Sequence, residues 1–269
     1  MGICTRATYL RRITLMIISY LIRRIREEPD PVRFIASRLL WRTGLCSLLT
    51  IPRQGYDLTF FPTDMSAALW LNRHYSDQDR SVIGGILRPG DTFVDVGANV
   101  GELSLFAAQS MGKRGFVVSI EAHPKTFSYL RRNIDRNPHL TLQAINAAAG
   151  NYNGKVNFTS RLSDGQNCVS AQGRCCIPTH TLDELLGNLG TIRLLKIDVE
   201  GYEKFVLEGA INLLTRTEYV YFEAWDRHAE RYCYKTPEIA ELLRSAGFQV
   251  PEFDASKCCN VLAAKFNAV

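Results

Sequence analysis

The stretch DVGANVG, from Asp95 to Gly101, holds the first residues whose types and spacing suggest chemistry. It follows a short apolar, β-branched run and precedes a helical pattern. Gly97 and Gly101 allow backbone torsions, or a close approach, that a side chain would block. The N–H groups that begin the next helix point at whatever is bound there. The stretch therefore predicts a ligand-binding turn between a strand and a helix.

The residues of this turn restrict the kind of ligand. A dinucleotide-binding turn has glycine at its first, third and sixth positions, which here hold Gly97, Asn99 and Glu102. Glu102 would oppose a pyrophosphate at the helix start, whereas Asp95 and Glu102 suit a ligand with a positive ammonium or sulfonium group. Glu121 ends the next strand pattern, where a carboxylate can accept both hydroxyls of a ribose.

A second set of titratable residues follows two later strand patterns. Asp198 and Glu200 stand in KIDVEGYE, and carboxylates crowded at a strand edge tend to have shifted pKa values. His228, in FEAWDRHAERY, is the candidate general base because its ordinary pKa is near neutrality; a solvated loop histidine is an equal alternative. Asp198, Glu200 or Glu223 would take the proton if partly desolvated. Mg²⁺ at Asp198 and Asp226 would lack a clear third ligand, so we expect no metal.

The elements that must position these residues alternate along the chain. From residue 92 onward strand and helix patterns alternate, which predicts a mostly parallel α/β sheet with helices on both faces. Ligands bind such sheets beyond the carboxyl ends of the strands. Residues 154–180 interrupt the alternation and predict an inserted hairpin. The predicted strands are 92–96, 116–121, 140–146, 192–198, 219–224, 248–250 and 260–266, and the predicted helices are 102–111, 124–136, 182–188, 201–214 and 237–246.

The first 54 residues differ in charge from the rest of the chain. They hold ten arginines and three carboxylates, whereas the remainder holds 22 basic and 24 acidic residues. The apolar run 13–22 is about half the length that a membrane-crossing helix requires. Residues 11–26 predict a basic amphipathic helix, which lies either on an anionic membrane surface or on its own domain. We therefore separate a helical segment, 1–54, from a main domain, 55–269.

The cysteines indicate the cellular compartment in which we expect the protein. The chain has eight, without a C-x-x-C motif, and arginines stand where a signal cleavage site would need small residues. This predicts reduced thiols in a cytoplasmic protein, peripheral at the inner membrane surface if residues 11–26 bind lipid. A zinc site built from the 168–176 and 258–259 clusters is the minor alternative.

Four motifs together, VDVGANVGELS, VVSIEAHPKTFSYLRRNI, THTLDEL and LLKIDVEGYEKFVLEGA, resemble the FkbM family of S-adenosylmethionine-dependent methyltransferases. The resemblance runs from about residue 60 to the C-terminus. It implies the class I methyltransferase fold, a Rossmann-like seven-stranded sheet with its last strand antiparallel, and S-adenosylmethionine as cofactor. It also implies O-methylation of a hydroxyl on a small-molecule acceptor, a glycan, a glycolipid or a secondary metabolite.

The same resemblance implies the residues of the cofactor site. Asp95, Asn99 and the two glycines would surround the methionine moiety, Glu121 would hold the ribose, and Asn146 would lie beside the adenine. The complete set is Asp95, Gly97, Ala98, Asn99, Gly101, Glu121, Ala122 and Asn146.

Two other functions compete with this one. The first is a membrane-associated binding protein that keeps the fold without turnover. The second is methylation of nucleic acid, but the main domain lacks a basic stripe, so we expect no nucleic-acid partner.

Overall fold

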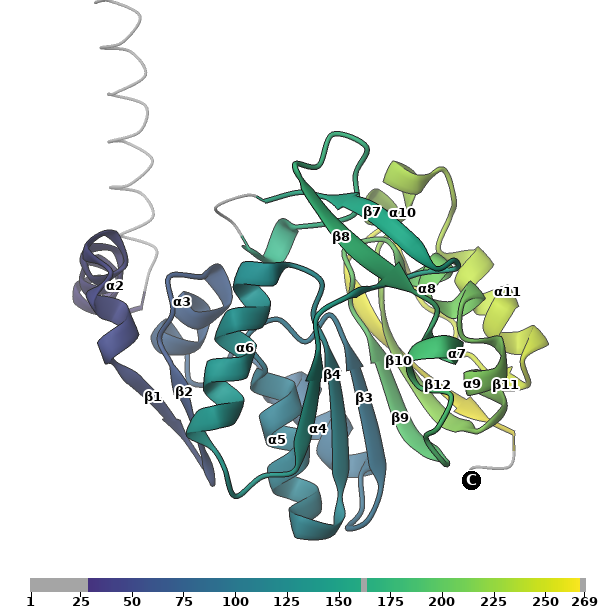
Figure 1. The fold of residues 1–269 in the computed structure, drawn as a ribbon, viewed down its shortest axis with the longest axis horizontal. Helices are drawn as coiled ribbons and strands as arrows, with labels where there is room; N and C mark the ends of the chain where they lie inside the picture. Colours follow the sequence, from purple (N-terminus) through teal and green to yellow (C-terminus); the bar gives the residue numbers. More distant parts are fainter. Residues whose placement is uncertain (1–28, 161–163, 267–269) are drawn as a thin grey trace, which may run out of the picture.

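The computed structural model describes residues 29–160 and 164–266 of the chain. Its centre is a seven-stranded sheet (Figure 1). The strands of this sheet are β3 (Thr92–Val96), β4 (Phe116–Ile120), β5 (Leu142–Ile145), β9 (Ile192–Ile197), β10 (Thr217–Ala224), β11 (Phe248–Gln249) and β12 (Cys259–Lys265). They lie in the order β11-β12-β10-β9-β3-β4-β5, parallel from β10 to β5, with β12 antiparallel to both neighbours. The predicted Rossmann-like class I methyltransferase sheet, with its antiparallel last strand, is confirmed.

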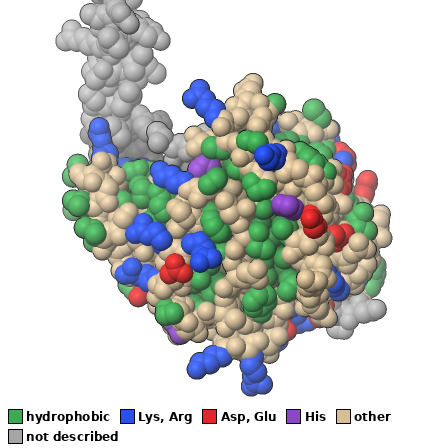
Figure 2. Space-filling view, viewed as in Figure 1, with side chains coloured by type: hydrophobic (Ala, Val, Ile, Leu, Met, Phe, Trp, Pro, Cys, Tyr) green, Lys and Arg blue, Asp and Glu red, His purple; other side chains and the backbone are tan. Residues whose placement is uncertain are grey.

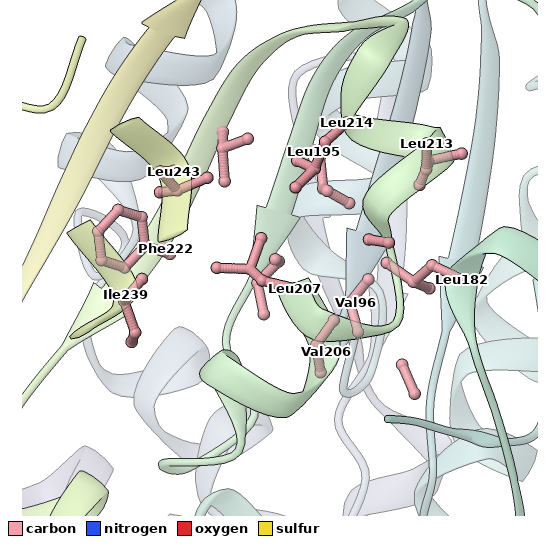
Figure 3. Packing of buried hydrophobic residues seen from close by; sticks show 14 of the residues in the cluster. Val96, Leu182, Leu195, Val206, Leu207, Leu213, Leu214, Phe222, Ile239 and Leu243 are labelled. Carbon is pink, nitrogen blue, oxygen red and sulfur yellow. The ribbon is translucent and has the colours of Figure 1, made fainter. Parts of the chain in front are cut away.

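The sheet is buried on both faces because its side chains alternate between two cores. Phe93 packs in a core with Ile83 and Ala107, from α4 (Asp77–Ile86) and α5 (Glu102–Met111). Val96 points to the opposite face and joins the core that Figure 3 shows, where Leu207 of α8 (Glu203–Glu208) lies close to the sheet. The other helices around the sheet are α6 (Pro124–Arg136), α7 (Leu182–Leu185), α9 (Ile211–Thr215) and α11 (Pro237–Ser245).

The helix predicted over 201–214 is two helices, α8 and α9, separated at Gly209. A Cβ at Gly209 would lie 1.9 Å from the carbonyl oxygen of Gly150, so only glycine lets these two segments meet. Short elements complete the list: η1 (Leu45–Leu48), η2 (Gly112–Arg114), η3 (Asp164–Gln166), α10 (Asp226–Ala229) and η4 (Glu230–Tyr232).

The segment before the sheet packs onto the same domain. It consists of α2 (Pro31–Thr43), β1 (Thr50–Arg53), β2 (Tyr56–Thr59) and α3 (Asp64–Leu71), followed by α4. β1 and β2 form an antiparallel hairpin, and the predicted boundary between residues 54 and 55 falls in its turn. Ile51 of β1 and Leu58 of β2 share a core with Leu105 of α5. The amphipathic helix predicted at 11–26 lies outside the described residues.

The predicted insertion is present as a second sheet. β7 (Gly154–Phe158) and β8 (Cys175–His180) pair antiparallel, and β6 (Ala148–Ala149) joins β8 to give the order β6-β8-β7. Figure 1 shows this sheet above the carboxyl edge of the main sheet. Across residues 29–160 and 164–266, no helix combines the length and apolarity needed to cross a membrane.

Candidate active site

A cavity of about 630 Å³ lies at the carboxyl edge of β3, β4, β9 and β10. Side chains of the loop between α3 and α4 and of the insertion also line it, among them Tyr75 and Phe158. Seven of its described lining residues are carboxylic acids and only one, Lys196, is a base; the acids are Asp79, Asp95, Glu102, Glu121, Asp198, Glu200 and Glu223. The cavity therefore favours a ligand with positive charge.

The predicted turn after β3 forms part of this wall. Gly97, Asn99 and Gly101 all have positive φ, at 80°, 50° and 89°. A Cβ at Gly97 would lie 1.8 Å from the carbonyl oxygen of Asp198, and one at Gly101 would lie 2.6 Å from Leu130. The glycines thus let the turn pack against the residue that follows β9 and against α6, and Gly97, Ala98 and Asn99 of the turn line the cavity.

Asp95 is fixed by an ion pair within the wall. One carboxylate oxygen is 3.0 Å from Lys196 Nζ and the other accepts a hydrogen bond from Ser104 Oγ at 2.6 Å. Burial opposes the charge of Lys196, but the carboxylates of Asp95 and Asp198 raise the pKa of the amine above its ordinary value. Lys196 was not among the residues predicted for the site, although a lysine inside the largely apolar stretch LLKID was a visible signal.

Glu121 lines the cavity at the end of β4, the strand next to β3, and its carboxylate accepts hydrogen bonds from backbone N–H groups. Its Oε2 accepts the Asn99 N–H at 2.9 Å and its Oε1 accepts the His123 N–H at 2.8 Å. Asn146 donates to the carbonyl oxygens of Glu121 and Ala122 at 2.8 and 3.1 Å. Ala122 lines the cavity and Asn146 does not, so Asn146 orients the end of β4 from behind.

Three carboxylates gather where β9 and β10 end. Burial is the main cause that raises the pKa of Asp198 to about 6 and that of Glu200 to about 8, and neighbouring carboxylates add to both shifts. Burial also acts to raise the pKa of Glu223, but hydrogen bonds from His228 Nδ1 at 3.1 Å and Cys258 Sγ at 3.2 Å hold it below its ordinary value. At neutral pH this cluster therefore contains both an ionised and a protonated carboxyl group.

His228 lies behind this cluster. Its side chain is buried, and it is not among the described residues that line the cavity. Its Nδ1 is 3.1 Å from Glu223 and 3.4 Å from Glu200, and its ring packs on Trp225 with centroids 4.1 Å apart. The carboxylates, not the imidazole, thus face the cavity.

The strained loop after β9 is held by Glu203. Glu200 has a φ of 59° and Gly201 one of 99°. The buried Oε1 of Glu203 accepts the N–H groups of Val199 and Gly201 at 3.0 and 3.1 Å. Glu203 therefore fixes the conformation of the loop that carries Asp198 and Glu200. Its position in the first turn of α8 suggests only a favourable interaction with the helix dipole.

Two other acids have structural partners. Glu102 accepts a hydrogen bond from Tyr56 at 3.1 Å and lies 3.4 Å from Arg80, which ties the N-terminal elements to α5. Asp226 accepts hydrogen bonds from the backbone and hydroxyl of Thr236 at the start of α11. No cluster of three or more His, Cys, Asp or Glu suited to a metal is found in the part of the chain that the structure describes.

Comparison with known proteins identifies the domain. Residues 95–250, more than half of the chain, match the methyltransferase FkbM domain. Over 137 residues the chain is 31% identical to hexuronic acid methyltransferase AglP of Haloferax volcanii; the match covers 49% of this chain and 55% of that protein, so the chain spans about half the length of this curated relative.

Solved structures with similar folds include two methyltransferases. One is methyltransferase FkbM from Methylobacillus flagellatus, at 15% identity and a TM-score of 0.46, covering 74% of this chain and 53% of that one. The other is a SAM-dependent methyltransferase from Aquifex aeolicus, at 16% identity and a TM-score of 0.43, covering 70% and 87%. The domain match confirms the resemblance, the methyltransferase class and the cofactor that the sequence predicts. The chain belongs to the FkbM family of S-adenosylmethionine-dependent methyltransferases.

Proposed function

We propose that this protein transfers a methyl group from S-adenosylmethionine to a hydroxyl of a sugar, in a glycan or glycolipid. The observation that carries the proposal is the cluster of Asp198, Glu200 and Glu223 in the cavity. In the strand order, the cluster lies at the ends of β9 and β10, on one side of the turn after β3. Glu121 lies on the other side of that turn, at the end of β4. The similarity to a hexuronic acid methyltransferase supports a sugar acceptor.

The residues of the cavity fit the cofactor. Its volume of about 630 Å³ lies within the usual range for ligand sites. The acidic lining suits the sulfonium and ammonium charges. The buried Asn99 Oδ1, which has no hydrogen-bond partner among the described residues, gives the turn an additional acceptor. When bound, S-adenosylmethionine supplies a methyl group on a good leaving group. We assign the ribose to Glu121, the methionine moiety to residues 95–101, and the adenine to the region of Ala122 that Asn146 holds in place.

The acceptor hydroxyl requires a base and an orienting partner. Glu223 is ionised at neutral pH because its hydrogen bonds hold its pKa low, so it accepts the hydroxyl proton as the oxygen–carbon bond forms. Glu200, with a pKa of about 8, keeps its proton and donates a hydrogen bond to a sugar oxygen. His228 orients Glu223 and is a positioning residue. Asp198, beside Lys196, borders the transfer path.

The function is tested with labelled cofactor and defined acceptors. The full chain is incubated with methyl-labelled S-adenosylmethionine and neutral hexosides, uronosides or glycolipids, and products are read by mass spectrometry. A sugar product with one added methyl group on oxygen supports the proposal, and Glu223→Gln should suppress it while cofactor binding persists. The proposal would be contradicted if none of these sugars is methylated while an amine or nucleic-acid acceptor, offered in a parallel reaction, takes the label.

A further inference from the structure

Helix α2 is apolar on two faces. Phe34 is buried, and Trp41 packs against the core that β1, β2 and α3 form. On the outer side, Val32, Ile35 and Leu39 are 77%, 43% and 60% exposed. They are spaced by three and four residues and so share one helix face. A surface helix normally buries one apolar stripe, so a second apolar face on α2 suggests a contact outside the domain.

The apolar patch extends beyond α2. Leu45 and Leu48, in η1, are 51% and 79% exposed. We define the apolar patch as Val32, Ile35, Leu39, Leu45 and Leu48; these are five of the nine exposed large hydrophobic residues in the described chain. Figure 2 shows hydrophobic side chains gathered at the edge of the molecule where Figure 1 places α2. Such a concentration of exposed apolar side chains marks an interaction surface.

The charge around the apolar patch is positive. Residues 29–54 contain four arginines and one acidic residue, Asp30, which caps the start of α2; Arg38 and Arg42 are exposed on α2 itself. Helix α6, which lies next to β2, carries exposed Lys125, Arg131 and Arg132 and one exposed acid, Asp135. Basic groups that surround an apolar helix face are typical of helices that lie in an anionic lipid interface.

Charge also separates the possible occupants of this face. A second copy of the chain, docked through the same face, would bring the exposed arginines of one α2 close to those of the other, and like charges across an interface are unfavourable. We propose that the apolar patch docks on a surface of anionic phospholipids, with its side chains among the headgroups. Because α2 packs on α3 and Met65 of α3 lines the cavity, docking would hold this side of the cavity near the membrane.

Vesicle flotation of the full chain tests this inference. The vesicles contain phosphatidylcholine alone or phosphatidylcholine with phosphatidylglycerol in a 7:3 ratio. The triple variant Val32→Ser, Ile35→Ser, Leu39→Ser should lower the partition coefficient on anionic vesicles by about tenfold or more, because apolar side chains supply the insertion energy. Ile211→Ser removes an apolar side chain of comparable exposure, 67%, from α9 and should leave partitioning unchanged.

The contribution of the arginines to vesicle binding is tested with a double variant on α2 and a matched control at η2. Arg38→Gln with Arg42→Gln should reduce anionic binding, whereas Lys113→Gln with Arg114→Gln, exposed at η2, should have less effect. Circular dichroism melting shows that each variant is folded. Equal vesicle binding by the triple variant and the wild type would overturn the inference, as would absence of wild-type binding. It would also be overturned by a lipid-free dimer that the triple variant dissociates.

Discussion

Glu121 offers the most direct test of the cofactor site. Its carboxylate is 8% exposed, lines the cavity and cannot turn away, because the N–H groups of Asn99 and His123 hold its two oxygens. In Glu121→Ala the two ribose hydroxyls lose a charged acceptor. At roughly 1.5 kcal/mol for each such hydrogen bond, the loss is about 3 kcal/mol, which corresponds to a cofactor affinity lower by about a hundredfold.

The same substitution also affects folding, and a matched control separates the two effects. Glu121→Ala leaves two backbone N–H groups without their acceptor, at a cost of about 1 kcal/mol each. Asp183 also accepts two backbone N–H groups, those of Asn212 and Leu213 at 3.0 and 2.7 Å, and does not line the cavity. Asp183→Ala should therefore lose similar stability and keep its cofactor affinity.

Isothermal titration with S-adenosylmethionine and its demethylated product, with chemical denaturation of each variant, measures both quantities. If Glu121→Ala binds the cofactor as tightly as the wild type, Glu121 does not hold the ribose. If Asp183→Ala weakens binding as much as Glu121→Ala does, the effect comes from lost stability and the assignment of Glu121 also fails.

Three further predictions concern the turn and the carboxylate cluster. Gly97→Ala should abolish cofactor binding and destabilise the fold more than Gly90→Ala does. Gly90 also has a positive φ, 97°, but open space around it, so Gly90→Ala should lower the free energy of unfolding by only about 1 kcal/mol in denaturation experiments. Glu223→Gln should lower kcat by about a hundredfold or more, and His228→Ala by about tenfold with unchanged cofactor affinity; a larger effect of the histidine would reverse their roles. Because burial raises the pKa of Glu200 to about 8, the folded state keeps a proton that the unfolded state has released, so the free energy of unfolding should fall by on the order of 2 kcal/mol between pH 6 and 8. Glu200→Gln should reduce that fall in thermal unfolding and leave the part that comes from Glu203, whose pKa burial raises to about 7; an unchanged slope would contradict the assignment.

The strand pattern of the sheet was predictable because both of its faces are covered. Strands such as TFVDV are rich in apolar and β-branched residues, and the predicted range 92–96 is the range of β3. The helix predicted over 201–214 was wrong as a single element. Its apolar periodicity continues through Gly209, and only the approach of Gly150 explains the break.

The residues of the site also fall into those that the sequence predicts and those that it does not. Asp95, Gly97 and Glu121 were visible because each stands at a strand end in a recognisable motif. Lys196 was missed as the partner of Asp95, because the two residues are 101 positions apart and meet only through the pairing of β3 with β9. The tethering of Glu102 to Tyr56 and Arg80 likewise depends on how the N-terminal elements fold back.

The alternation of strands and helices, the family, and the carboxylates at the strand ends can all be predicted from the residues alone. They follow from local apolar periodicity and from residue types that a single motif carries. Which groups face the cavity depends on how the elements pack. This packing sets His228 behind Glu223 and Glu200, and it places Asn146 behind Glu121. Burial and the pairing of distant charges then set the protonation of each carboxyl group, and both depend on contacts between strands that no local pattern records.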